Sequence, residues 1–552
     1  MAEGSPIGIP ILSLITFAPL LGVLLLLFVP KEKGNLIKQI GIAASFLPLL
    51  LCVWLYSMYD VTGSSAQFAE RLAWIQLPLS MELMNQSGNA FAAYLLQFDY
   101  ALSVDGISLP LVFLTALVSA MAALASVHIK KRWKTYFILF LLLQTGMFGV
   151  FLARDLFLFF VFFEITLVPM FFLVGIYGYH DRERAANRFL VYNGIGSAIM
   201  LIAFLILVAT AGMSLTTDEA GSAITYSGSY DVVFDNLNQH GSFANSNPEL
   251  APGFPSPFYL SEGLRTALFF MLLVAFGIKL PIFPFHTWML KVHTEAPPSV
   301  VMIHSGILLK MGAYGLLRFG VLLFPNEAKQ WAVLLAVLGV VNILYGASLA
   351  FVQRDFKLVL AYSSISHMGI VLLGLAAMNG IGVQGAVFQM VSHGFISALM
   401  FLIVGSIYER TQSSMLDDLG GLAKPMPFMS GILLVAGMAS LGLPGLSGFV
   451  SEFLAFLSLF STMPVITAIG CLGIILTAVY VLRGVLSITY GSAKQAAENY
   501  KDARFVEAVP MIALVAFILL IGIYPAVLSE PLNATIGGLT ELLENAGTKV
   551  GG

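Results

Sequence analysis

Apolar runs of about 20 residues recur along almost the whole chain, and they constrain its fold more than any other feature. A helix of that length spans the hydrocarbon core of a bilayer. Of the 552 residues, 58% are hydrophobic and only 10% are charged, whereas soluble globular chains carry about 25% charged residues. The sequence therefore predicts an all-α polytopic membrane protein, without a soluble domain large enough to hold a nucleotide or a flavin.

We expect about fourteen transmembrane helices in a single membrane domain over residues 1–552. The predicted spans lie near residues 10–29, 38–58, 107–127, 135–152, 154–177, 186–211, 264–287, 299–322, 330–351, 355–378, 381–408, 426–449, 463–490 and 508–528. The seventh and the twelfth are interrupted by prolines. A polar insertion at 211–261, rich in Gly, Ser, Asn and Pro, is predicted to be a surface loop.

Basic residues indicate how the chain crosses the membrane, because Lys and Arg concentrate in cytoplasmic segments. With the N-terminus outside, 19 of the 27 basic residues fall in inner segments. The outer segments hold Arg71, Arg154, Arg265, Arg318, Lys329 and Lys549, and the remaining two, Lys279 and Lys310, lie deep within spans. This bias predicts that both termini lie outside, and we expect the chain in the cell's inner (cytoplasmic) membrane.

Two pairs of similar segments indicate an internal repeat. "RDLFLFF" at Arg154–Phe160 and "RDFKLVL" at Arg354–Leu360 each open a span, on opposite sides of the predicted topology. "LLVAFGIKLPIFPF" at Leu272–Phe285 and "LLVAGMASLGLPGLSGF" at Leu433–Phe449 begin alike and then break at proline. We therefore expect two inverted five-helix repeats, each with a broken helix, as in inverted-repeat transporters. The predicted boundaries are 130–325 for the first repeat, which includes the loop, 326–505 for the second, and 506–552 for a C-terminal helix and tail.

Six ionisable residues stand well inside apolar spans, where a charged group costs about 2.5–3.5 kcal/mol. They are Glu164, Lys279, Lys310, His367, His393 and Glu452. Structural ion pairs between helices explain a single such pair, but six groups on six helices indicate proton transfer, since buried pairs are rarely a net gain over apolar packing. For the two histidines alone, a simple hydrogen bond to a neighbouring helix is an equally good explanation.

The break after Lys279 is the most informative of these sites. Pro281 and Pro284 free backbone carbonyl groups one turn earlier, and such groups are tolerated at membrane depth only against water or protein. We interpret the break as the border of a hydrated cavity. A lysine there can switch between charged and neutral forms as its neighbours change, and Glu164 is the candidate neighbour.

Three further histidines and the two cysteines carry weaker signals. His286, His293 and His304 lie near the ends of spans, where we expect water to reach at least the first two. Cys52 and Cys471 both lie in apolar spans without a CxxC pattern, which gives no support for an iron–sulfur cluster or a disulfide. We expect no cofactor or metal in this chain.

Three runs resemble a known family: "GIKLPIFPFHTW", "HTEAPPSVVMIHSGILLKMGAYGLLRF" and "LAYSSISHMG". They are similar to the antiporter-like, proton-translocating subunits of respiratory complex I, a family that includes chains of multisubunit cation/proton antiporters and membrane-bound hydrogenases. The resemblance covers roughly residues 100–505. It implies that Glu164 pairs with the broken-helix Lys279, that Lys310 is the central lysine, and that His367 and His393 line a hydrated axis.

Glu452 narrows the resemblance further. Several sister subunits carry lysine at this place in the second broken helix, and the glutamate here is similar to that of the M-type chains of NADH–quinone oxidoreductase, called subunit 4 in mitochondria. The antiporter alternative is weakened by this residue. The family pattern assigns no role to the insertion at 211–261.

The predicted function is proton translocation by a membrane subunit of complex I, coupled to electron transfer from NADH to quinone. NADH and quinone are expected to be handled by partner subunits. Other membrane subunits, including sister antiporter-like chains, and the lipid bilayer are the expected partners, and nucleic acid is not. The alternatives are a subunit of a multisubunit Na⁺/H⁺ antiporter or of a membrane-bound hydrogenase, and a structural scaffold, which the buried charges disfavour.

Overall fold

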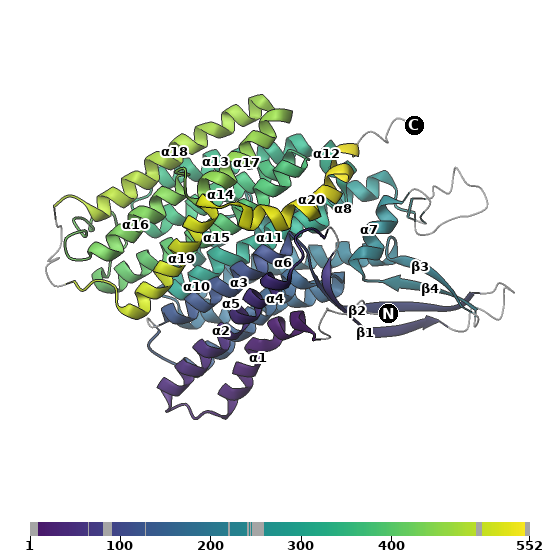
Figure 1. The fold of residues 1–552 in the computed structure, drawn as a ribbon, viewed down its shortest axis with the longest axis horizontal. Helices are drawn as coiled ribbons and strands as arrows, with labels where there is room; N and C mark the ends of the chain where they lie inside the picture. Colours follow the sequence, from purple (N-terminus) through teal and green to yellow (C-terminus); the bar gives the residue numbers. More distant parts are fainter. Residues whose placement is uncertain are drawn as a thin grey trace.

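The computed structural model describes residues 9–63, 66–80, 91–126, 129–218, 221–239, 242, 244–245, 259–492 and 500–546. Its helices form one bundle, and a small β-sheet projects from one end of it (Figure 1). Twelve helices in the described part are long and apolar enough to cross a membrane. This confirms the predicted helical, multi-pass membrane protein.

Twelve of the fourteen predicted spans correspond to these continuous helices. They are α1 (Ile11–Phe28), α2 (Gly34–Met58), α3 (Ser108–Ala125), α4 (Trp133–Leu152), α5 (Leu156–Tyr177), α6 (Arg182–Ala209), the composite helix Pro298–Val321, α13 (Ala332–Val352), α14 (Phe356–Ala376), α15 (Gly380–Thr411), α18 (Pro464–Thr489) and α19 (Phe505–Ile523). The composite helix and α15 are buried along their whole apolar length, so they form the centre of the bundle.

The two spans predicted as interrupted each consist of two shorter helices. The first pair is α8 (Glu262–Lys279) and α9 (Thr287–Glu295), and the second is α16 (Pro427–Ser440) and α17 (Ser447–Thr462). Both pairs extend beyond the predicted 264–287 and 426–449, because each break carries a helical segment on both sides. The total of fourteen membrane crossings remains a prediction.

Four strands form a sheet that the sequence analysis did not predict. They are β1 (Gln67–Ser80), β2 (Phe91–Val104), β3 (Met213–Asp218) and β4 (Gly221–Ser227), in the order β1-β2-β4-β3. β2 is antiparallel to β1 and parallel to β4, and β3 is antiparallel to β4. The all-α expectation was therefore incomplete, and the described part of the insertion at 211–261 is not only a loop: it holds β3, β4 and α7 (Tyr230–Asn238).

The two Arg-Asp pairs take the same local structure at opposite ends of the bundle. Asp155 caps α5 by accepting hydrogen bonds from backbone N–H groups, and Asp355 caps α14 in the same way. Each aspartate also forms an isolated antiparallel bridge, to Ser229 and to Met415 respectively. The start of α14 lies beside the end of α5, because Lys357 contacts Tyr179. This geometry agrees with inverted repeats, whose boundaries stay a prediction.

Two further helices complete the sheet end of the bundle. α12 (Pro325–Gln330) precedes α13, and α20 (Ala526–Asn545) lies across the bundle (Figure 1). The Gly106 N–H, just after β2, donates to Thr535 Oγ1 at 2.9 Å, and Gln384 of α15 donates to Asn533 at 3.1 Å. α20 therefore links the N-terminal and C-terminal halves of the chain.

Candidate functional site

The first break places Lys279 at the end of α8, where its ammonium group faces two aromatic rings. Its Nζ atom lies 5.0 Å from the centroid of the Phe163 ring and 5.4 Å from that of Phe189. The carbonyl of Ile278 accepts a hydrogen bond from the Trp288 indole at 3.1 Å. A side chain therefore satisfies one of the backbone groups at the break, as membrane depth requires.

Glu164 and Lys279 do not form the predicted pair through a hydrogen bond. Glu164 Oε1 and Lys279 Nζ are buried, and neither has a hydrogen-bond partner among the described residues. The predicted pair is therefore not joined through these atoms, because Lys279 Nζ lies against aromatic rings. The two charges still attract one another across the gap. Because Lys279 Nζ is buried without a hydrogen-bond partner in the described structure, a small movement of either helix changes the electrostatic energy of this lysine.

Lys310 lies between two π-helical segments of the composite helix. η3 (His304–Leu308) precedes and η4 (Leu316–Val321) follows α11 (Leu309–Gly315), and α10 (Pro298–Ile303) opens the composite helix. Lys310 Nζ donates to the Ser305 carbonyl and lies 2.7 Å from His393 Nδ1 on α15. π-Helical turns are rare and are frequent at functional sites. Here they flank a lysine that is in direct contact with a predicted site histidine.

The contact between Lys310 and His393 is the first in a series that leads through His367 to Glu452. The rings of His393 and His367 have centroids 5.2 Å apart. His367 Nδ1 lies 3.4 Å from Glu452 Oε1 and 3.3 Å from Gln389 Nε2, and its other nitrogen lies 3.3 Å from Ser440 Oγ. Nδ1 can donate to the glutamate or accept from the glutamine, but not both at once. The structure thus brings four of the six predicted residues together, in the order Lys310, His393, His367, Glu452.

At the second break, the Glu452 carboxylate lies close to the turn that joins α16 to α17. Gly442 and Gly445 have φ angles of +78° and +92°, which favour glycine. A Cβ atom on Gly442 would lie 2.7 Å from Glu452 Oε2. Glycine at this position therefore allows both the sharp turn and the close approach of the carboxylate.

His293 and His304 form a buried pair that the sequence analysis underrated. His293 Nε2 and His304 Nδ1 are 2.8 Å apart, and the second nitrogen of each ring has no partner among the described residues. Both rings are buried, as is His286. The expectation that water reaches His286 and His293 is therefore wrong for this structure, because α6 and α14 pack against α9, the second half of the broken helix. The close spacing of histidines around "HTEAPPSVVMIH" was the available signal.

The His293–His304 pair lies between the two lysines. His304 is within electrostatic range of both Lys279 and Lys310. It also shares a neighbour with Lys279, since the Phe189 ring centroid is 6.0 Å from that of His304. No hydrogen bond joins the histidine pair to either lysine in the described structure, so bridging water is needed to connect these groups.

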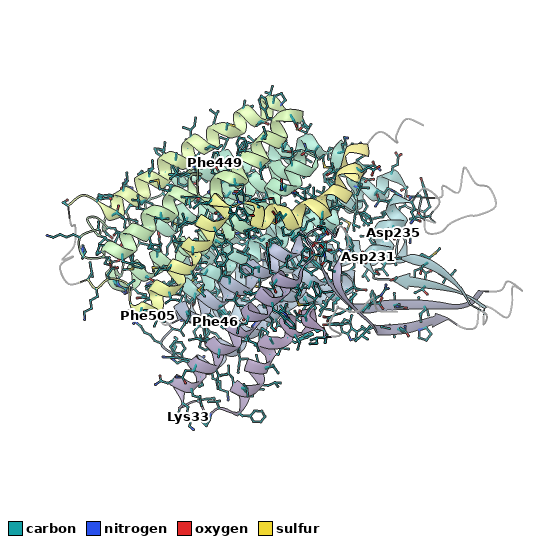
Figure 2. All side chains as sticks on the ribbon, in the orientation of Figure 1. Lys33, Phe46, Asp231, Asp235, Phe449 and Phe505 are labelled. Carbon is teal, nitrogen blue, oxygen red and sulfur yellow. The ribbon has the colours of Figure 1, made fainter. Side chains whose placement is uncertain are left out.

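A buried ion cluster lies at the sheet end of the composite helix. Arg318 donates two hydrogen bonds to the Asp105 carboxylate, and Arg154 lies 3.6 Å from it. Burial raises the pKa of Asp105, but the charges of Arg318 and Arg154 outweigh burial and lower it to about 2. Because this pKa is depressed, the stability that the cluster provides is lost only as the pH falls through the acid range. Asp231 of α7, at the base of the sheet, pairs with Arg154 at 2.7 Å (Figure 2).

We predict that Asp105→Ala strongly destabilises the protein. Removing this carboxylate leaves Arg318 buried without its partner, which costs about 3–5 kcal/mol. The amount of chain in the membrane and its thermal unfolding temperature should both fall. Asp231→Ala is the matched control, because the Asp231 side chain is 61% exposed and such a pair contributes less than about 1 kcal/mol. Equal effects of the two substitutions would contradict the prediction.

The chain is similar to several known proteins over most of its length. The model of a family described as "NADH:quinone oxidoreductase/Mrp antiporter, TM" matches residues 153–477. The chain is 35% identical to the chloroplast NAD(P)H-quinone oxidoreductase chain 4 of Chlorokybus atmophyticus, over 96% of this chain and 95% of that one. It is 34% identical to the NADH-quinone oxidoreductase subunit M of Rhodobacter capsulatus, over 96% of each chain. A chain of respiratory complex I from Thermus thermophilus with bound NADH is 27% identical, with a TM-score of 0.77 over 96% of this chain and 99% of that one.

Proposed function

The chain belongs to the NADH:quinone oxidoreductase/Mrp antiporter transmembrane family, and on that premise we propose that it translocates protons as an M-type membrane subunit of complex I. Electron transfer from NADH to quinone takes place in partner subunits and drives the movement of protons through this chain. The expected partners are other membrane subunits, including sister antiporter-like chains. The chain itself is expected to hold no cofactor.

The observation that carries this proposal is the buried line from Lys310 to Glu452. Its members come from four different helices: the composite helix, α15, α14 and α17. Each of them can hold a proton in one state and release it in another, and their contacts of 2.7 Å and 3.4 Å are short enough for transfer directly or through one water. A scaffold protein has no need for such a line in its core.

In the proposed mechanism, the charge of Lys310 controls proton transfer from Lys310 to Glu452. A proton leaves Lys310 Nζ for His393 Nδ1, which turns the lysine neutral and the imidazole positive. The opposite ring nitrogen of His393 then passes a proton to His367, and His367 passes one to Glu452. A carboxylate in an apolar environment holds that proton until water or a positive charge approaches.

We propose that Glu164 and Lys279 control when a proton reaches Lys310. When a partner subunit moves the Glu164 carboxylate away, the ammonium group of Lys279 loses the attraction that stabilises it and tends to lose its proton. The His293–His304 pair, which lies between the two lysines, is the proposed relay to Lys310. An imidazole suits this role because it donates from one nitrogen and accepts at the other.

We place the chain in the inner membrane with both termini outside, which puts the sheet outside as well. The bias of basic residues supports this orientation, although Lys494 and Lys549 lie outside the described residues. The tip of the α1–α2 hairpin, where Lys33 lies, points away from the sheet (Figure 2). The sheet end of the bundle is called the outer end below, and the opposite end the inner end.

A complex purified through a tag on this chain tests the proposed function. It should reduce quinone with NADH and, in liposomes, move protons across the membrane in a way that an inhibitor of quinone reduction stops. The rival is a Na⁺/H⁺ antiporter subunit, a class that the family also includes. A purified complex that exchanges Na⁺ for protons without quinone reductase activity would establish the rival instead.

A further inference from the structure

Lys357 is a buried lysine that the proposed proton line does not use. It lies in the first turn of α14, at the inner end of the bundle, and only 7% of its surface is exposed. Its position is unusual because two halves of the chain meet there. Tyr179 follows α5 in the first predicted repeat, and Tyr408 lies near the end of α15 in the second.

The two tyrosines hold the ammonium group of Lys357 between their rings. Its Nζ atom lies 4.4 Å from the ring centroid of Tyr179 and 3.7 Å from that of Tyr408. The two rings contact each other edge to face, with centroids 5.0 Å apart. A cation held against two aromatic faces is stabilised most strongly where water is excluded. A shift between the two halves of the chain would separate the rings and release the lysine.

Nearby acidic groups can stabilise the ammonium group of Lys357 in a second position, nearer to water. Asp355, Glu295 and Glu409 are all within electrostatic range of its ammonium group. Glu295 also fixes the Tyr179 side of the cage, since its carbonyl accepts from the Tyr179 N–H at 2.8 Å and its carboxylate accepts from the Asp181 N–H at 2.9 Å. The lysine can therefore leave the cage without losing all its partners.

A small pocket lies behind Lys357. It is lined by Lys357 on one side and His293 on the other, with Ala296, Phe401 and Val404 among the remaining walls. The pocket has room for about one water molecule. In this structure Lys357 therefore stands between the acidic surface and the His293–His304 pair.

We infer that Lys357 is a gate for proton uptake, closed in this structure, which opens the pocket beside His293 to inner water when its side chain moves from the tyrosine cage towards the acidic rim. The inference rests on the proposed function. Lys357 acts here by position and charge rather than by carrying the translocated proton. A gate at the contact of the two halves would let a movement between them decide when His293 receives a proton.

A cysteine at Ala296 reports directly on the gate. In inside-out vesicles that expose the inner face, Ala296→Cys should react slowly with (2-aminoethyl)methanethiosulfonate. Adding Lys357→Ala should speed the reaction at least about tenfold, the size expected from losing a desolvated cation–π contact, and Lys357→Arg should leave it slow. The product is measured by the mass of the labelled peptide, and the buried Cys52 of the same chain shows whether the fold has loosened.

Proton pumping supplies the second readout. Lys357→Ala should lower the number of protons moved per electron while quinone reduction continues, and Lys357→Arg should restore it. Lys130→Ala is the matched control, since Lys130 faces Glu409 at 3.9 Å but its side chain is 85% exposed. If the wild-type complex pumps but Lys357→Ala changes neither labelling nor pumping, the gate is refuted and the proposed function stands. If the wild-type complex does not pump, the proposed function itself fails.

Discussion

Lys279→Ala is expected to lower the rate of proton translocation at least about tenfold, the lower range for losing a proton-transfer group, while the complex still assembles. Lys279 Nζ is buried at a helix break, without a hydrogen-bond partner in the described structure. It interacts with its surroundings mainly through the charge of Glu164 and the faces of two aromatic rings. The substitution therefore removes the group that is proposed to gain and lose a proton, without breaking hydrogen bonds in the core.

Translocation is measured in inside-out vesicles as the proton gradient formed on adding NADH, normalised to the rate of quinone reduction. Glu164→Ala should give a similar loss, because it removes the charge that acts on Lys279. Lys291→Ala is the control, since Lys291 lies on α9 but is partly exposed and pairs with Asp181 only at the surface. Normal pumping by an assembled Lys279→Ala or Glu164→Ala complex would show that the two charges are structural.

Glu452→Gln should reduce pumping by a similar factor, at least about tenfold. The amide keeps the size of the carboxylate and can still hydrogen-bond to His367, so the turn at Gly442 remains intact. What the amide cannot do is bind and release the proton. The number of protons moved per electron should therefore fall sharply while the amount of complex and its quinone reductase activity are kept.

Two companion variants sharpen the Glu452 experiment. Glu452→Lys restores a titratable group, as sister subunits carry, and should recover part of the pumping. Glu530→Gln removes an exposed carboxylate from α20 and should have no effect. A Glu452→Gln complex that pumps at the wild-type ratio would take this residue off the proton path, and the M-type assignment would then rest on sequence similarity alone.

The strands and the histidine pair show why some features escaped prediction from the sequence. β4 pairs with β2, with Thr225 opposite Leu95, so the sheet depends on a contact between segments far apart in the chain. His293 and His304 lie near predicted helix ends, which normally meet water, but other helices cover them here. Local patterns of apolar residues contain no information about either contact.

The sequence by itself determined that this chain spans a membrane, roughly where its helices lie, where two of them break, and which six buried groups are costly to keep. These properties follow from hydrophobicity and backbone chemistry, which act over about 20 residues or fewer. Only the tertiary structure decided that Lys310 contacts His393 and that His367 lies between His393 and Glu452. It also showed that Lys279 Nζ forms no hydrogen bond to Glu164 and that Lys357 lies between two tyrosine rings. The reason is that each of these arrangements involves segments far apart in the sequence, and side-chain packing across the whole bundle decides which of their faces meet.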